Sequence, residues 1–216
     1  MSQLKLVISG GQDGVDLGAL LAARYMNIPT GGYMPKEFQT ERGRNPLRAQ
    51  EFNLKESSGS YKRRDMENVD MADGVVAFLV DRPMTGRGTT STVRYAERGD
   101  HVFDPLVKPE DGNFLEISGP TAKKPCLVMW MPEMPPCDKG NAREIRRKAL
   151  RDYHKPIAEF IVKHRIEKLM VSGFCASTYE EADQIIQNLF VNVFYYVYAL
   201  NRRSALKDEP EKVNTE

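Results

Sequence analysis

The sequence predicts an α/β fold in which a parallel sheet of about five strands carries helices on both faces. Short apolar runs alternate with helical patterns along most of the 216 residues. The run 74–80 is apolar without interruption, as is typical of strands covered on both faces, and 124–131 predicts another buried strand. Glycine-rich turns follow several of the predicted strands, and parallel sheets are built by such repeated connections from strand to turn to helix.

The first half of the chain predicts strands and helices in strict alternation. The strands are expected at 4–9, 28–34 and 74–80, and the helices at 16–26, 61–72 and 89–98. Asp16 is a suitable N-cap for the first helix, because its carboxylate can accept from first-turn amides. Residues 35–60 are predicted to form one long polar loop, and long loops in compact domains are more often binding elements than filler.

The second half predicts strands at 124–131 and 167–173, a helix within 149–165 that begins near Pro156, and a closing helix over 178–203. Ser177 or Thr178 is the expected N-cap of that closing helix. Residues 99–123 are predicted to form an irregular insertion. We therefore expect one domain over 1–203, followed by a charged, disordered tail at 204–216.

Composition excludes several classes of function. The formal net charge is +1, so a global basic field for nucleic acid is absent, and we expect no nucleic-acid partner. No run approaches a membrane span or a signal peptide. Three cysteines without a C-x-x-C pair indicate a reducing compartment, so we expect a cytoplasmic location. The three histidines are scattered, and no metal site is predicted.

Three glycine turns are the candidate binding elements: "SGGQDGVD" (9–16), "TGRGTT" (85–90) and "SGFCAS" (172–177). Free amides at a helix start, approached closely over glycines, can hold a phosphate. Turns after two strands of one parallel sheet would share a crevice, and Arg87 adds a planar donor set. The alternative is that each turn only connects a strand to a helix.

Asp13 stands in the middle of the first turn, where a carboxylate repels an anion. We expect it to point outward or to cap an amide. The alternative is a general acid whose pKa is raised by a bound phosphate. The basic side chains of the loop 34–64 flank the same region and are candidates for facing an anion.

The closing helix is apolar almost all round, and a surface helix needs only one apolar stripe. Its broad face consists of Ile185, Ile186, Leu189, Phe190, Val193, Phe194 and Val197, widened by Val191, Tyr195, Tyr196 and Tyr198. The excess is either buried beneath the insertion or forms a subunit interface. We favour a homo-oligomer interface over 178–200, because Tyr and Phe suit such surfaces.

Six motifs carry a family resemblance: "ISGGQDGVD", "IPTGGYMPK", "YKRRDMENVDMADG", "MTGRGTTSTVRYA", "KKPCLVMW" and "VSGFCAS". In this order and spacing, the chain resembles the proteins described as "putative molybdenum carrier proteins". These are related to the YpsA branch of the SLOG superfamily, which also includes the lonely-guy-type nucleotide hydrolases. The resemblance spans roughly residues 4–190 and implies a Rossmann-like sheet that binds a nucleotide derivative or a molybdenum-containing ligand, commonly as an oligomer.

The glycine turns and the resemblance together give the expected ligand-binding residues. They are Ser9, Gly10, Gly11, Gln12, Asp13, Gly14, Gly32, Lys36, Tyr61, Arg64, Asn68, Thr85, Gly86, Arg87, Gly88, Thr89, Gly173 and Ser177. The resemblance also matches Asp16 to the first loop, and Gly31 and Pro35 to the end of the second strand.

Two departures from the family pattern bear on function. Asp13 replaces a threonine, and Thr92 stands near the place of the glutamate that lonely-guy-type hydrolases need. We therefore expect no catalytic residues, and no cofactor unless it is a bound nucleotide derivative, molybdate or molybdenum cofactor. The expected role is that of a carrier, sensor or sequestering protein for a phosphate-bearing nucleotide derivative, molybdate or molybdenum cofactor. The alternative is a nucleotide hydrolase with Asp13, Asp16 or Glu97 as its acid.

Overall fold

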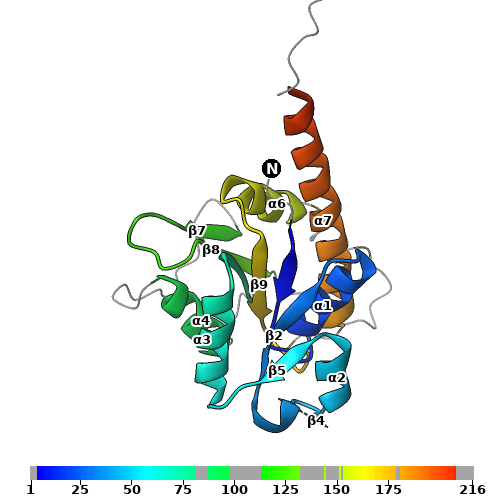
Figure 1. Ribbon diagram of the computed structural model, residues 1–216, viewed down its shortest axis with the longest axis vertical. Coiled ribbons are helices and arrows are strands. Elements are labelled where there is room, and N and C mark those ends of the chain that lie inside the picture. The colour runs from blue at the N-terminus through cyan, green and yellow to red at the C-terminus, as the bar shows by residue number, and fades with distance from the viewer. Residues whose placement is uncertain are drawn as a thin grey trace, which may run out of the picture.

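The computed structural model describes residues 4–80, 87–97, 113–131, 144, 151, 153–178 and 181–207. Seven strands form one sheet in the order β5-β2-β1-β9-β6-β8-β7, with helices on either side of it (Figure 1). The last strand in the chain, β9, therefore lies in the middle of the sheet. All neighbours pair in parallel except β7, which is antiparallel to β8. The predicted α/β, Rossmann-like fold is confirmed.

Five strands fall where the sequence predicts them: β1 (Leu6–Ile8), β2 (Thr30–Met34), β6 (Gly74–Val80), β8 (Cys126–Met131) and β9 (Lys168–Gly173). Two further strands, β5 (Leu54–Glu56) and β7 (Phe114–Ile117), bring the sheet to seven. Both are short, partly exposed edge strands; β5 (LKE) is mostly polar, and Glu116 interrupts the apolar residues of β7 (FLEI). They therefore lack the apolar run by which a buried strand is recognised.

Two layers of helices cover the sheet. Helices α1 (Val15–Tyr25), α6 (His154–Lys163) and α7 (Ala182–Lys207) share one hydrophobic cluster, and α3 (Tyr61–Met71) and α4 (Arg87–Glu97) share another. Alternate residues of β6 feed the two clusters: Val76 and Phe78 join the first, and Val75 and Ala77 the second. Such alternation explains why this strand is apolar at every position.

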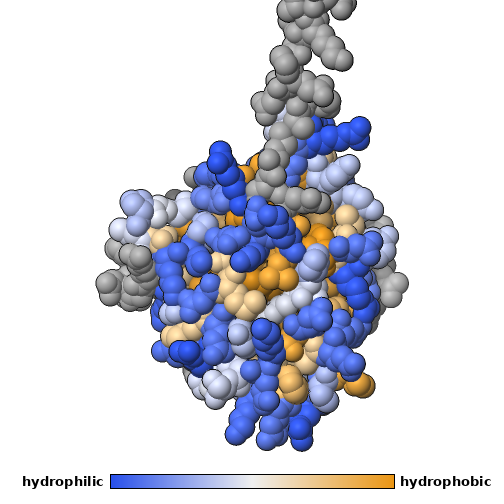
Figure 2. All heavy atoms as spheres, in the orientation of Figure 1, coloured by the Kyte–Doolittle hydropathy of each residue, from blue (hydrophilic) through white to orange (hydrophobic). Residues whose placement is uncertain are grey.

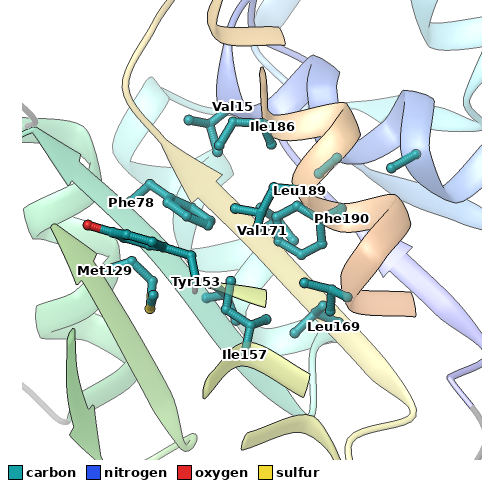
Figure 3. Packing of buried hydrophobic residues seen from close by; sticks show 14 of the residues in the cluster. Val15, Phe78, Met129, Tyr153, Ile157, Leu169, Val171, Ile186, Leu189 and Phe190 are labelled. Atoms are coloured by element: carbon teal, nitrogen blue, oxygen red, sulfur yellow. The ribbon is translucent and has the colours of Figure 1, made fainter. Parts of the chain in front are cut away.

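The broad apolar face of α7 packs inside the protomer. Phe190 lies edge-on to Phe78 of β6, with ring centroids 5.9 Å apart, and Leu189 and Phe190 meet Val171 of β9 in the same cluster (Figure 3). All seven residues of the predicted face are buried. Of the residues expected to widen this face, Tyr195 and Tyr198 stay exposed.

The prediction of one long polar loop over 35–60 was wrong. This segment forms the turn η1 (Lys36–Phe38), a hairpin of β3 (Gln39–Thr40) and β4 (Gly43–Arg44), helix α2 (Pro46–Glu51) and strand β5. Asn45 caps α2 by accepting from the Arg48 amide at 3.0 Å, and Pro46 occupies the first helical position. Phe52 and Leu54 bury against Leu20 of α1 and anchor the segment.

Several expected boundaries shift. Gly14, not Asp16, is the N-cap of α1, and α7 begins at Ala182, beyond the predicted caps Ser177 and Thr178. The helix α7 extends to Lys207, four residues into the expected tail, while 208–216 and 98–112 lie outside the described residues. Within the described ranges, no helix is both long and apolar enough to cross a membrane.

Candidate functional site

The first and third glycine turns meet at the carboxyl ends of β1 and β9. The amide of Val15, the first residue of α1, donates to the Phe174 carbonyl at 3.2 Å, and the Ala176 amide donates to the Asp13 carbonyl at 3.2 Å. Helix α4 begins beyond the neighbouring strand β6, although residues 81–86 of the second turn lie outside the described residues. Carboxyl ends of adjacent parallel strands are where open α/β sheets place their ligands.

Arg64 of α3 lies directly against the first glycine turn. A Cβ added to Gly10 would stand 1.3 Å from Arg64 Nη1, so the guanidinium occupies the space that the glycine leaves. Arg64 is only 7% exposed, and among the described residues its Nε has an ion-pair neighbour but no hydrogen-bond partner. Its Cζ lies 5.9 Å from the centroid of the exposed Tyr61 ring. The structure thus places a buried cation at the predicted anion site.

Two carboxylates flank this cation. Arg64 Nη1 lies 3.5 Å from Asp16 Oδ2, and Arg64 Nε lies 3.3 Å from Asp65 Oδ1. Asp65 also reaches the start of α4, since its Oδ2 would be 4.0 Å from a Cβ on Gly88. The predicted capping role of Asp16 changes: its Oδ2 accepts from the Gln12 amide at 3.3 Å, inside the glycine turn.

Burial governs the protonation of both acids. Desolvation raises the pKa of Asp16, although the charge of Arg64 and hydrogen bonds from Gln12, Ser9 and Gly10 oppose the shift. Desolvation likewise raises the pKa of Asp65 to about 6, against the lowering effect of Arg64 and with a further rise from the charge of Asp16. Both groups therefore hold a proton more readily than an exposed aspartate.

Asp13 neither points outward nor caps an amide. It is 2% exposed, and Arg48 of α2 donates from Nη2 to its Oδ1 at 2.8 Å. Arg48 Nη1 also donates to the Gly11 carbonyl at 2.9 Å. The acid that seemed to repel an anion is thus neutralised by an arginine 35 positions further along the chain.

The β3–β4 hairpin lies over the same turn. Gln12 Nε2 donates to the Gln39 carbonyl at 2.9 Å, and the Ser177 amide and hydroxyl donate to Glu41 at 3.2 and 2.5 Å. Ser177 therefore holds the hairpin instead of capping α7. Burial, together with the charge of Glu41, raises the pKa of Cys175 to about 12, so its thiol stays protonated. At the lower end of the molecule in Figure 1, where the hairpin and α2 lie, the surface is mostly hydrophilic (Figure 2).

Packing accounts for several predicted site residues. A Cβ on Gly14 would meet the Phe174 carbonyl at 2.7 Å, one on Gly32 the Ser9 carbonyl at 2.3 Å, and one on Gly173 the Val15 side chain at 2.6 Å. Gly14 and Gly32 also have φ of 97° and 130°. These three glycines allow close approach of strands, turns and helix within the protein itself.

Two of the predicted polar site residues form hydrogen bonds inside the protein, and a third is exposed. Asn68 is fully buried and exchanges hydrogen bonds of 2.7 and 3.1 Å with the Tyr33 backbone, which ties α3 to β2. Ser9 is also buried, and its hydroxyl donates to the Val171 carbonyl at 2.8 Å. Lys36, by contrast, is exposed on η1.

The second glycine turn lies only partly within the described residues. Thr89 is buried and Gly88 exposed in the first turn of α4. Thr85 and Gly86 lie outside the described residues, as does the side chain of Arg87.

Of the acids suggested for a hydrolase, Glu97 does not lie near the glycine turns. It ends α4, and its charge contributes to raising the pKa of the buried Cys126 at the first residue of β8. Cys126 lies at the amino end of β8, whereas the glycine turns follow the carboxyl ends of the parallel strands. The described residues contain no group of three or more His, Cys, Asp or Glu side chains suited to a metal ion.

Sequence reasoning overlooked Asp65, Glu41 and the pairing of Arg48. Asp65 could have been found, because Val69 and Ala72 define the buried face of α3, and residues 65 and 68 lie on that face at helical spacing. Glu41 and Arg48 carried no such signal. Each stood among the charges of a segment interpreted as a loop, and their partners are 136 and 35 positions away.

Comparison with known proteins now adds to this geometry. The family model of the circularly permutated YpsA SLOG family matches residues 7–111, which include the first glycine turn and Arg64. The resemblance to YpsA-related SLOG proteins is confirmed. The last strand of the chain, β9, lies at the centre of the sheet, which accords with the permuted order of elements in the name of the matching family model.

A solved structure supports the same relationship. It is the crystal structure of a "putative molybdenum carrier protein" from Syntrophus aciditrophicus SB, which is 27% identical in sequence. The alignment covers 89% of this chain and 96% of that chain, with a TM-score of 0.62. No curated protein matched.

Proposed function

We propose that this protein is a non-catalytic binding protein for an oxyanion-bearing small molecule. The ligand class comprises phosphate-bearing nucleotide derivatives, molybdate and molybdenum cofactor, and the role is that of a carrier, sensor or sequestering protein. The observation that carries the proposal is the Arg64 guanidinium, buried in the space left by Gly10 at the carboxyl ends of the central strands. A planar guanidinium beside helix-start amides is the donor set that oxyanions prefer.

The surroundings of Arg64 support binding more than turnover. Asp13 is engaged with Arg48, and Glu97 lies at the other edge of the sheet, so two of the three suggested acids have other roles. Thr92 donates its hydroxyl to the Gly88 carbonyl at 3.2 Å within α4 and supplies no acid. The relative from Syntrophus aciditrophicus, whose name describes a molybdenum carrier, adds support for the carrier role.

Thermal shift measurements test this proposal. Molybdate, ADP-ribose and cyclic dinucleotides form the panel, and a ligand present at 100 times its Kd adds about 2.7 kcal/mol of stability. For a chain of this size, that corresponds to a rise in Tm of about 5–11 °C. If no member of the panel raises Tm, the proposal fails.

A matched pair of variants localises the effect. Arg64→Met removes the buried guanidinium, and we expect it to abolish the shift. Arg63→Met changes the adjacent residue, whose side chain is 64% exposed and bound to Glu67, and we expect it to retain the shift. Equal shifts in both variants would place the ligand elsewhere.

One observation favours a nucleotide hydrolase as the second candidate. Asp16 and Asp65 both have raised pKa values and flank one arginine, an arrangement that suits general acid or base chemistry near neutral pH. Chromatography of each ligand after long incubation tests this candidate. Product formation that disappears in Asp65→Asn supports it, whereas unchanged ligand excludes it for the compounds tested.

We also propose that the protein assembles as a homo-oligomer through α7. Tyr195 and Tyr198 are three residues apart, on one side of the helix, and are 55% and 63% exposed. The C-terminal part of α7 projects beyond the sheet (Figure 1). Exposed tyrosines on a projecting helix are typical of interface residues.

A further inference from the structure

The first glycine turn already holds an anion of its own. Asp16 is 5% exposed, its carboxylate accepts from the Gln12 amide at 3.3 Å, and it lies 3.5 Å from Arg64 Nη1. A hydrogen bond from the Gly10 amide also favours the ionised form of Asp16. Asp16 therefore occupies the donors that an oxyanion bound at this turn would use.

An external anion and an ionised Asp16 cannot share these donors at low cost. Both are negative, both need the Arg64 guanidinium, and the site is buried, so their repulsion is poorly screened. A proton on Asp16 removes the conflict. The neutral carboxyl group accepts less strongly from the Gln12 amide, and it can donate its own O–H to the incoming oxyanion.

Resting on the proposed function, we propose that oxyanion binding at the first glycine turn takes up one proton, which passes from solvent to Asp16. The proton balance is simple: the free protein holds an Asp16 carboxylate, and the complex holds a neutral carboxyl group beside the bound anion. Low pH then loads the site and high pH empties it. For a carrier, this gives a means of release that requires no change of fold.

The other charged groups around Asp16 reinforce this direction. From α3, Asp65 adds a second negative charge beside Arg64. From the hairpin and the segment after β9, Glu41 and Cys175 face the turn, and neither supplies a cation. From the turn itself and from α2, Asp13 and Arg48 neutralise each other. Among the described side chains, the one positive charge of Arg64 is thus shared between two acids. Asp16 is therefore protonated more easily than it would be with an arginine of its own.

Isothermal titration calorimetry with molybdate and sulfate tests the inference, because both anions stay fully deprotonated near neutral pH. In two buffers of different ionisation enthalpy, the difference in heat gives the number of protons taken up. We expect about one proton per anion at pH 7.5, and a Kd that rises about tenfold from pH 7 to pH 8.

Three variants identify the proton site. Asp16→Asn keeps the shape of the side chain but cannot ionise, so we expect no proton uptake, a Kd that changes less than about threefold from pH 7 to pH 8, and tighter binding than wild type at pH 8. Asp65→Asn should keep the pH dependence. Asp70→Asn is the matched control, since Asp70 lies on the same α3 but faces Lys123 and Tyr95 at the surface.

The outcomes separate this inference from the proposed function. Binding without proton uptake and with a flat Kd in wild type overturns the inference and leaves the proposed function standing. Loss of the pH dependence in Asp65→Asn but not in Asp16→Asn also overturns it. No binding of either anion between pH 5.5 and 8, while nucleotides bind with Arg64 dependence, overturns it as well. No binding by any probe overturns both proposals. If Asp16→Asn does not fold, the wild-type proton count still decides.

Discussion

Breaking the Asp13–Arg48 ion pair from either side is expected to destabilise the protein by about 3–5 kcal/mol. The two side chains are 2% and 9% exposed, and the N–O distance is 2.8 Å. Arg48→Met preserves much of the side-chain stem but leaves Asp13 as a buried charge, and Asp13 Oδ2 already has no hydrogen-bond partner among the described residues. Asp13→Thr, the change toward the residue that the family resemblance implies here, leaves Arg48 as the buried charge.

The structure also sets the expectation for the double variant. With both charges removed, the penalty of an unpaired buried charge disappears, while the Gly11 carbonyl still loses its donor. We therefore expect the double variant to be more stable than the sum of the single effects implies, by about 2–3 kcal/mol. In a chain of this size each single variant should lower Tm by roughly 6–20 °C.

Urea unfolding of the wild type, the two single variants and the double variant supplies the assay. Arg44→Met is the control, because Arg44 pairs with Glu37 on the surface at 3.7 Å and should contribute no more than about 1 kcal/mol. Single variants within about 1 kcal/mol of wild type and additive in the double variant would refute the reasoning. The pair would then be a contact without consequence for the first glycine turn.

Three more predictions address the site, the acid range and the assembly. Gly10→Ala forces the Arg64 guanidinium away, since the new Cβ would lie 1.3 Å from Nη1; we expect at least about tenfold weaker binding by calorimetry, and unchanged affinity would locate the ligand elsewhere. Although burial opposes it, hydrogen bonds including one from a lysine lower the pKa of Glu116 to about 2. The stability that ionised Glu116 contributes to the fold is therefore complete above pH 4.5 and is lost as the pH falls through about 2. In acid unfolding curves, Glu116→Gln should reduce stability at pH 6 but not at pH 2. Glu substitutions at Tyr195 and Tyr198 together should yield monomers in light scattering, and an unchanged mass would argue against the α7 contact.

The sequence predicted best where one physical signal dominates. Strand β6 is apolar at every position because the sheet is covered on both faces, so its bounds of Gly74–Val80 match the prediction. Strands β5 and β7 lie at the two edges of the sheet, where one side of each strand has no partner strand. Both sequences are short, β5 is mostly polar and β7 is only partly buried, so neither stands out from a loop, and the neighbouring strands define them.

The helix α7 was recognised from its apolar pattern, but the surface against which it packs was not. Its apolar residues were visible, but their partner was not, because periodicity does not distinguish burial inside a protomer from burial between two. The structure assigns the broad face to packing with Phe78 and Val171, leaving the exposed tyrosines for other contacts (Figure 3).

The candidate site was predicted in part for a similar reason. The glycine turns and Arg64 follow from motifs, which are local in the chain. The Asp13–Arg48 pair and the Glu41–Ser177 contact join segments 35 and 136 positions apart, so only the folded chain brings them together. In the sequence, Asp13 stood out as a charge that would repel an anion. In the structure it supports the first glycine turn, and Asp16 is the acid that competes with a ligand.

The central claim is that Arg64 binds an oxyanion-bearing ligand at the first glycine turn. Native mass spectrometry after incubation with molybdate, ADP-ribose and cyclic dinucleotides tests it most directly. The account predicts one ligand per chain in wild type and in Arg63→Met, and none in Arg64→Met. Equal occupancy in all three proteins, or no bound ligand in any of them, would contradict it.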